Sequence, residues 1–198
     1  MTSEINFSSS ESVESVASVA TGQQSLRIRV AAPEDAAGVL ALMDGIMDWL
    51  ISLGRTAQWG TTHWSAVPAR VSLITDRIAR RELSVAETEG GEIAGILSVS
   101  ETPGAYIHPA EEPELYVNLL ATSRGFKGRN VGGLLIATAK EEARRRGHGL
   151  IRVDCFAGDD GRLKRWYASQ GFEEVAPFTV PREMGPDWPG MLFAMRVA

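Results

Sequence analysis

The sequence predicts an α+β fold in three layers, in which a sheet of about seven strands is flanked by about four helices. Residues 26–30 alternate apolar and polar side chains, as a half-buried strand does. Two strand-like segments, 83–87 and 93–99, are joined by the sequence Glu-Gly-Gly-Glu at 89–92, which suits a hairpin turn. Residues 131–146 show a helical pattern. Helices and strands are therefore interleaved along the chain.

The other elements follow in order. A first helix opens at Pro33, because proline and two acidic residues occupy its first turn. Its apolar face comprises Val39, Leu40, Met43, Ile46, Met47, Leu50 and Ile51. A second helix covers about residues 68–81, with Val71, Ile74 and Ile78 along it. Further strands are expected at 115–121, 150–156, 172–179 and 191–197, and the last helix at 160–170.

Length and composition set the domain organisation. The chain has 198 residues, of which 44% are hydrophobic, enough for one well-buried domain. Residues 1–24 are rich in serine, carry three glutamates and contain no lysine or arginine. Such a segment cannot bury enough apolar surface to order itself. We expect a disordered tail at 1–24 and a single domain at 25–198.

Charge and cysteine content exclude several classes. The net charge of −5 argues against a nucleic-acid-binding protein, which normally shows a basic excess. No apolar stretch is long enough to span a bilayer, and the N-terminus does not resemble a secretory signal, so no membrane partner is expected. Cys155 is the only cysteine, and the three histidines are scattered, so we expect no metal. These features indicate a cytoplasmic protein.

The most informative segment is the glycine-containing turn at 127–133, between the strand at 115–121 and the helix at 131–146. Backbone N–H groups at such a helix start form a site for phosphate oxygens. The glycines fit neither a mononucleotide P-loop nor a dinucleotide fingerprint, although Asp154 lies near the position of a ribose-binding acid. Taken alone, the turn is equally compatible with an ordinary helix start.

Residues 120–132 resemble the acyl-CoA motif of the GNAT acetyltransferase superfamily. The strand end, the aromatic residue before the turn and the pattern R/Q-G-x-G-I-G fall in register. Two positions depart from it, because Lys127 replaces the usual Arg or Gln and Asn130 replaces the middle glycine. Asparagine tolerates positive φ better than other non-glycine residues, so the turn can keep its shape.

A second motif lies about forty residues further on. Residues 166–172, Trp-Tyr-Ala-Ser-Gln-Gly-Phe, are similar to the family's L-Y-x-x-x-G-F, and Asp160 lies where asparagine is common. The resemblance covers about residues 26–180. It implies a GNAT-like, mostly antiparallel sheet that splays between its fourth and fifth strands, and acetyl-CoA as the co-substrate.

The resemblance also implies roles for individual residues. The strand end would pair with the pantetheine arm and direct one N–H group at the thioester carbonyl, where negative charge develops. Tyr167 would be the general acid that protonates the departing thiolate. The implied coenzyme-binding residues are Leu120, Ala121, Thr122, Lys127, Gly128, Arg129, Asn130, Val131, Gly132, Gly133 and Asp160.

The general base is less defined. Glu114 is the candidate that we favour, while Asn118, Glu101 and Asp154 also lie on or near strands that could reach the acceptor. For each of these residues the alternative is a purely structural role; Glu114, for example, would then simply face water at the start of a strand. Cys155 suits a buried structural role better than that of an acyl-accepting nucleophile, so we expect direct transfer in a ternary complex.

These observations predict an N-acetyltransferase that acts on the primary amine of a small molecule. A protein or peptide N-acetyltransferase and a noncatalytic acyl-CoA-binding module remain alternatives. Aromatic residues in the acceptor-facing segments either wall a pocket or anchor the loops. They are Trp49, Trp59, His63, Trp64, Tyr106, His108 and Trp188. The resemblance also leads us to expect a homodimer.

Overall fold

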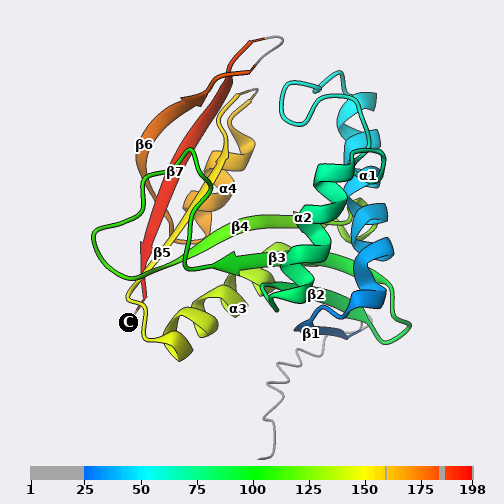
Figure 1. Cartoon of the computed structure of the whole chain (residues 1–198), viewed down its shortest axis with the longest axis horizontal. Helices are drawn as coiled ribbons and strands as arrows, with labels where there is room; N and C mark the ends of the chain where they lie inside the picture. Colours follow the sequence, from blue (N-terminus) through cyan, green and yellow to red (C-terminus); the bar gives the residue numbers. More distant parts are fainter. Residues whose placement is uncertain (1–24, 159, 183–185, 198) are drawn as a thin grey trace, which may run out of the picture.

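The computed structural model describes residues 25–158, 160–182 and 186–197 (Figure 1), so the predicted tail at 1–24 lies outside the described residues. The predicted order of elements is confirmed. The strands are β1 Leu26–Val30, β2 Leu83–Thr88, β3 Ile93–Ser100, β4 Glu114–Thr122, β5 Leu150–Phe156, β6 Glu173–Val180 and β7 Trp188–Arg196. The helices are α1 Ala36–Ser52, α2 Pro68–Ala79, α3 Val131–Arg146 and α4 Arg162–Ser169, with short 3-10 turns η1 Pro33–Asp35, η2 Trp64–Ala66 and η3 Arg124–Phe126.

Most differences from the predicted boundaries have a backbone cause. α2 ends before the predicted residue 81 because Arg81 adopts a φ of 57°. α4 begins at Arg162 instead of residue 160 because Gly161 has a φ of 66° and precedes the first helical turn. β7 begins earlier than predicted because Trp188 pairs with Val180 of β6.

The seven strands form one sheet in the order β1-β2-β3-β4-β5-β7-β6. Only the β4–β5 pair is parallel, so the predicted mixed, mostly antiparallel sheet is confirmed. α1 and α2 cover one face with a core that includes Val85 and Ile96, and α3 and α4 cover the other with a core that includes Leu97 and Ile151. The structure therefore has the three predicted layers, with the sheet between two pairs of helices.

The β4–β5 pairing is short and then opens. It runs from Glu114 opposite Leu150 to Val117 opposite Val153, and beyond that point the two strands diverge (Figure 1). The next residue of β4, Asn118, is a bulge, because Val117 pairs with Val99 of β3 whereas the next paired residue is Leu119. A bulge bends its strand, which accounts for the divergence.

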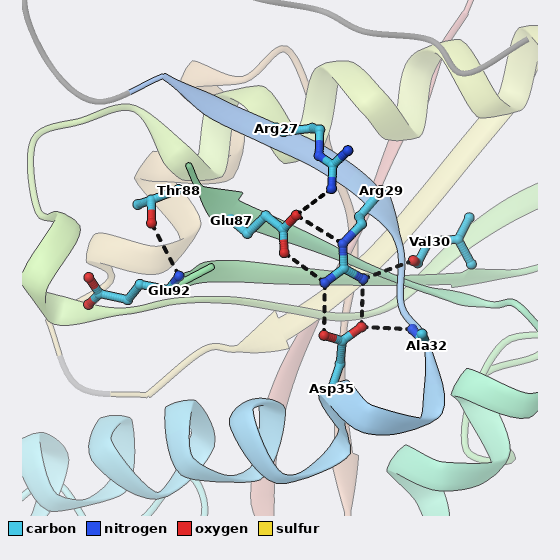
Figure 2. Close-up of polar contacts among 8 residues, drawn as sticks. All are labelled: Arg27, Arg29, Val30, Ala32, Asp35, Glu87, Thr88 and Glu92. Atoms are coloured by element: carbon cyan, nitrogen blue, oxygen red, sulfur yellow. Dashed lines mark hydrogen bonds and ion pairs between the residues drawn. The ribbon is translucent and has the colours of Figure 1, made fainter. Parts of the chain in front are cut away.

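An ion-pair cluster fixes the start of α1 against the sheet (Figure 2). Arg29 of β1 donates to both oxygens of Asp35 and to both oxygens of Glu87 in β2, at 2.6–3.0 Å. Asp35 also accepts the N–H of Ala32 at 2.7 Å. Both carboxylates are buried, so Arg29 supplies the charge that balances them.

Replacing Arg29 with methionine should lower the free energy of unfolding by about 2–3 kcal/mol, because two buried carboxylates lose their shared cation. Hydrogen bonds from Arg29 are the largest cause that holds the pKa values of Asp35 and Glu87 below their usual range. Such groups contribute stability above their unfolded pKa that is lost as pH falls. Urea unfolding should therefore show a smaller loss of stability in the variant than in the native protein as pH falls below about 5, through the ordinary pKa values of 3.8 and 4.5 that the two carboxyls have in the unfolded chain.

The matched control is Arg27→Met. The Arg27 side chain is 55% exposed and donates to Glu87 at 2.8 Å. Its loss should cost less than about 1 kcal/mol, as is usual for an exposed ion pair. Equal losses in the two variants would show that the cluster does not depend on Arg29.

Candidate functional site

The glycine-containing turn leaves several backbone N–H groups without acceptors. Gly128 and Asn130 have φ values of 83° and 55°, so the asparagine keeps the backbone shape expected of the glycine that it replaces. In the described part of the chain, the N–H groups of Gly128, Asn130, Val131, Gly132 and Gly133 have no hydrogen-bond acceptor; the first helical bond runs from Leu134 to the Asn130 carbonyl. These free donors at the start of α3 fit phosphate oxygens.

Asn130 is accommodated by the residue three positions later. A Cβ atom on Gly133 would lie 2.3 Å from Asn130 Oδ1, so the asparagine side chain occupies space that any other residue at 133 would need. The departure from the motif at Asn130 is thus matched by the absence of a side chain at Gly133. Because residue 133 is glycine, there is room for the Asn130 side chain, at a position where the family motif has glycine.

Positive side chains surround the turn. Lys127 is exposed and has no acidic partner among the described residues. The Arg129 guanidinium lies 5.2 Å from the ring centre of Phe126, and that of Arg124 lies 3.9 Å from the ring centre of Trp49 in α1. Lys127 therefore remains available to a phosphate, and the Arg124 contact ties the preceding turn, η3, to α1.

Close packing joins the turn to both the sheet and α4. A Cβ atom on Gly95 of β3 would lie 2.8 Å from Val131 Cγ1, so this glycine lets the start of α3 approach the sheet. A Cβ atom on Gly132 would lie 2.7 Å from the ring of Trp166 in α4. Trp166 stands where the second motif has leucine, and the larger ring requires a glycine beneath it.

Tyr167 lies next to that contact and points into the core under α4. It is 4% exposed and packs against Phe172 and Phe193. Burial is the main cause that raises the pKa of Tyr167 above its usual range, with further contributions from Cys155 and Asp154. No hydrogen bond of its hydroxyl group to another described residue is present. The phenol stays protonated, and its proton is not committed to a neighbour.

Asp154 lies on the other face of β5, immediately after the last residue paired with β4. Its Oδ1 accepts a hydrogen bond from the Tyr116 hydroxyl at 2.5 Å, and Oδ2 accepts one from Tyr106 at 3.4 Å. Burial is the largest cause that raises the pKa of Asp154, and the two tyrosine hydrogen bonds oppose it. A partly buried carboxylate with a raised pKa can accept a proton near the opening.

Glu114 does not lie at the opening. It is the first residue of β4, and its two oxygens accept hydrogen bonds from Arg152 Nε and Nη2, both at 2.6 Å. Oε1 also accepts the N–H of Ala110 at 3.0 Å, and Arg152 donates to the His108 carbonyl. The expectation that Glu114 is the base is not supported by this geometry, because the buried pair anchors the β3–β4 loop.

The other candidate bases are also engaged. Asn118 accepts hydrogen bonds from Arg77 and Ser100 and donates to the Thr102 carbonyl. Glu101 lies on the surface beside His148 at 3.2 Å. Cys155 is buried, and burial raises its pKa to about 12, so the thiolate needed for attack is scarce. Of the acids considered, only Asp154 lies at the opening.

Asp160 is held by arginines. Its carboxylate lies 2.9 Å from Arg55 Nη2 and 3.0 Å from Arg162 Nε, and it accepts the N–H of Arg162. That backbone hydrogen bond is the largest cause that lowers the pKa of Asp160. Arg55 follows α1, so the pair connects the α1–α2 loop to the entry of α4. No local sequence pattern predicts this pairing, because Arg55 and Asp160 are 105 residues apart in the chain.

The α1–α2 loop also contacts the β6–β7 hairpin. The Gln58 carbonyl accepts hydrogen bonds from Arg182 Nη2 at 3.0 Å and from Trp188 Nε1 at 3.1 Å. Trp64 is buried in the α1–α2 core, and Trp59 packs on its edge. The aromatics of this loop therefore anchor it, which was one of the two roles expected for them.

The described residues contain neither a metal-binding cluster nor a membrane-spanning helix. No group of three or more histidine, cysteine, aspartate or glutamate side chains there could hold a metal ion. None of the helices in that part of the chain has the length and apolarity needed to cross a bilayer.

Comparison with known families decides the assignment. Residues 42–172, more than half of the chain, match the model of the Acetyltransferase (GNAT) family. The chain belongs to the GNAT acetyltransferase family. It is therefore an enzyme that transfers an acetyl group from acetyl-CoA, and the predicted family and co-substrate are confirmed.

Solved structures share the GNAT fold at low identity. A GNAT acetyltransferase from Listeria monocytogenes is 23% identical, with a TM-score of 0.67 over 91% of this chain and 100% of that one. A ribosomal-protein-alanine N-acetyltransferase from Brucella melitensis is 23% identical, with a TM-score of 0.64 over 86% and 99%. The yncA protein of Salmonella typhimurium, solved with its cofactor acetyl-CoA, is 17% identical, with a TM-score of 0.63 over 87% and 94%. A search of curated proteins found no match.

In this GNAT enzyme, Gly132→Ala should lower the free energy of unfolding by about 1–3 kcal/mol, because the added methyl group collides with the Trp166 ring. Denaturant unfolding measures the change. Combining Gly132→Ala with Trp166→Leu, the residue of the motif, should recover most of the loss.

Gly45→Ala is the matched control, since a Cβ atom at Gly45 of α1 would meet nothing within 4 Å. Alanine should stabilise that helix by roughly 0.5–1 kcal/mol. If Gly132→Ala stabilised the protein as Gly45→Ala does, the packing of α4 on the turn would not be a constraint.

Proposed function

We propose that the protein transfers the acetyl group of acetyl-CoA to the primary amine of a small molecule, directly within a ternary complex. The observation that carries the proposal is the placement of Tyr167 and Asp154 on opposite faces of β5, where its pairing with β4 ends. Tyr167 provides a proton, and Asp154 accepts one. Both groups are needed when an ammonium group must lose a proton and a thiolate must gain one.

The coenzyme side of the proposal rests on the turn and the end of β4. The free N–H groups of Gly128 and of residues 130–133 and the Lys127 ammonium would hold the pyrophosphate. Beyond Val117, the β5 side of β4 has no strand partner among the described residues, so Leu120, Ala121 and Thr122 can offer backbone groups to the pantetheine arm. Acetyl-CoA supplies the thioester; these residues bind and orient it. Asp160, whose carboxylate is held by Arg55, remains an expected coenzyme-binding residue.

A small-molecule acceptor is supported by the contacts across the α1–α2 loop. The loop bonds to the β6–β7 hairpin through Gln58 and to the α4 entry through Arg55. An extended peptide would have to break these contacts to lie between the loops. The lone cysteine and the need for acetyl-CoA support a cytoplasmic location, which stays a prediction.

The test of the function is a thiol-release screen with acetyl-CoA against primary amines, amino acids and short peptides. Release with a small amine supports the proposal. Release with peptides alone would favour the protein acetyltransferase, and coenzyme binding without release on any acceptor would favour a noncatalytic module.

Tyr167→Phe should lower kcat by roughly 100-fold or more, because the departing thiolate loses its proton donor. The Kd for acetyl-CoA, measured by calorimetry, should change little, since the variant keeps the buried ring. Unchanged turnover would remove Tyr167 from the mechanism.

Asp154→Asn should lower kcat/KM by roughly 100-fold. It should also abolish the decrease of kcat/KM at low pH, here called the acid limb of the pH profile. In the native enzyme, activity should fall as pH falls through the raised pKa of Asp154, because the protonated carboxyl cannot accept a proton. Tyr116→Phe removes a hydrogen bond that favours the ionised form, so it should move this limb to higher pH.

Glu114→Gln is the discriminating control. The acid limb should persist in this variant, because Glu114 is paired with Arg152 away from the opening. An acid limb that vanished in Glu114→Gln and persisted in Asp154→Asn would reverse the assignment of the base.

A further inference from the structure

Four aromatic rings form a continuous row, here called the aromatic wall: Tyr106, Phe156, Phe178 and Trp188. Tyr106 stacks on Phe178 with ring centres 5.7 Å apart and planes 21° from parallel. Phe178 lies 5.9 Å from Trp188, which lies 5.7 Å from Phe156. The rings come from the β3–β4 loop, β5, β6 and β7, so only the tertiary structure brings them together (Figure 1).

Two glycines hold the wall in place. Gly190 of β7 pairs with Phe178, and a Cβ atom on Gly190 would lie 2.3 Å from the Phe178 ring. A Cβ atom on Gly158 would lie 2.3 Å from the Phe156 ring. Trp188 is fixed in turn by its hydrogen bond to the Gln58 carbonyl. The rings are therefore prearranged instead of being free to rotate into solvent.

One end of the aromatic wall lies beside Asp154, the proposed general base. Asp154 and Phe156 are alternate residues of β5, so their side chains lie on one face of the sheet. Tyr106 belongs to the wall and also donates to Asp154 Oδ2. Tyr106 is 52% exposed, and Phe178 and Trp188 are half-buried, so the row presents apolar surface beside the carboxylate.

Two acidic side chains at the end of the β3–β4 loop are paired with arginines. Glu114 is neutralised by Arg152, and Glu112 pairs with Arg196 at 2.7 Å. At the far end of the wall, Arg182 shares the Gln58 carbonyl with Trp188 and places a cation there. A flat uncharged group would stack on the rings, and the row ends between the Arg182 cation and the Asp187 carboxylate, which precedes Trp188 in the chain.

We infer that the acceptor is a primary amine carried by an aromatic group, with its ring on the aromatic wall and its nitrogen at Asp154. This inference rests on the proposed function. In this inference, Phe178 and Trp188 select the acceptor by contacting its ring, whereas Tyr167 and Asp154 carry out the proton transfers.

The test measures kcat/KM by thiol release for 2-phenylethylamine, butylamine, ethanolamine and 1,4-diaminobutane with the full chain. 2-Phenylethylamine should exceed each of the others by at least about tenfold. If ethanolamine, butylamine or 1,4-diaminobutane matched or exceeded it, the inference would fail while the proposed function stood. If none of the four amines released thiol, the inference would fail, and the wider screen of amines, amino acids and peptides would decide the proposed function.

Variants locate the preference on the wall. Phe178→Leu keeps an apolar side chain but removes the ring, and Gly190→Ala displaces that ring. Both should reduce the ratio of kcat/KM for 2-phenylethylamine to that for butylamine by about fivefold or more. Phe178→Tyr should retain the ratio.

The matched control is Val175→Ala, a truncation at a residue of β6 that is 54% exposed. It should leave the ratio unchanged. A ratio that did not move in Phe178→Leu and Gly190→Ala, with circular dichroism showing folded protein, would overturn the assignment of the wall.

Discussion

The bulge at Asn118 is the constraint on which the arrangement of the site depends. Asn118 is fixed by Arg77, Ser100 and the Thr102 carbonyl, so β4 bends directly after Val117. The parallel pairing with β5 ends at that residue. Backbone groups at the end of β4 are thereby left for a ligand, in a sheet whose other strands are paired along most of their length.

The same opening explains how the two groups to which we assign proton transfer, Tyr167 and Asp154, lie close together in different surroundings. Successive residues of β5 face opposite sides of the sheet, so Asp154 faces Tyr116 and Cys155 faces α4 and Tyr167. Each group is partly or fully removed from water, and burial raises both pKa values. A carboxyl with a raised pKa becomes a stronger base, and a phenol with a raised pKa keeps its proton at neutral pH.

Much of the fold could be predicted from local patterns. The boundaries of α3 and β5 follow from helical and strand periodicity bounded by glycine, and they match the structure. The turn was also predictable, because glycine and asparagine tolerate positive φ. Glu114 illustrates the limit: its position on a strand is local information, whereas its pairing with Arg152 depends on the β4–β5 register.

The sequence by itself determined the order of the elements, the glycine-containing turn before α3 and the tyrosine of α4, because each depends on residues close together in the chain. Only the tertiary structure decided that Asp154 lies at the opening, that Arg55 reaches Asp160, and that four rings from separate segments form one surface. These contacts join residues that are far apart along the chain. Strand register and loop packing determine them, and no short motif encodes either.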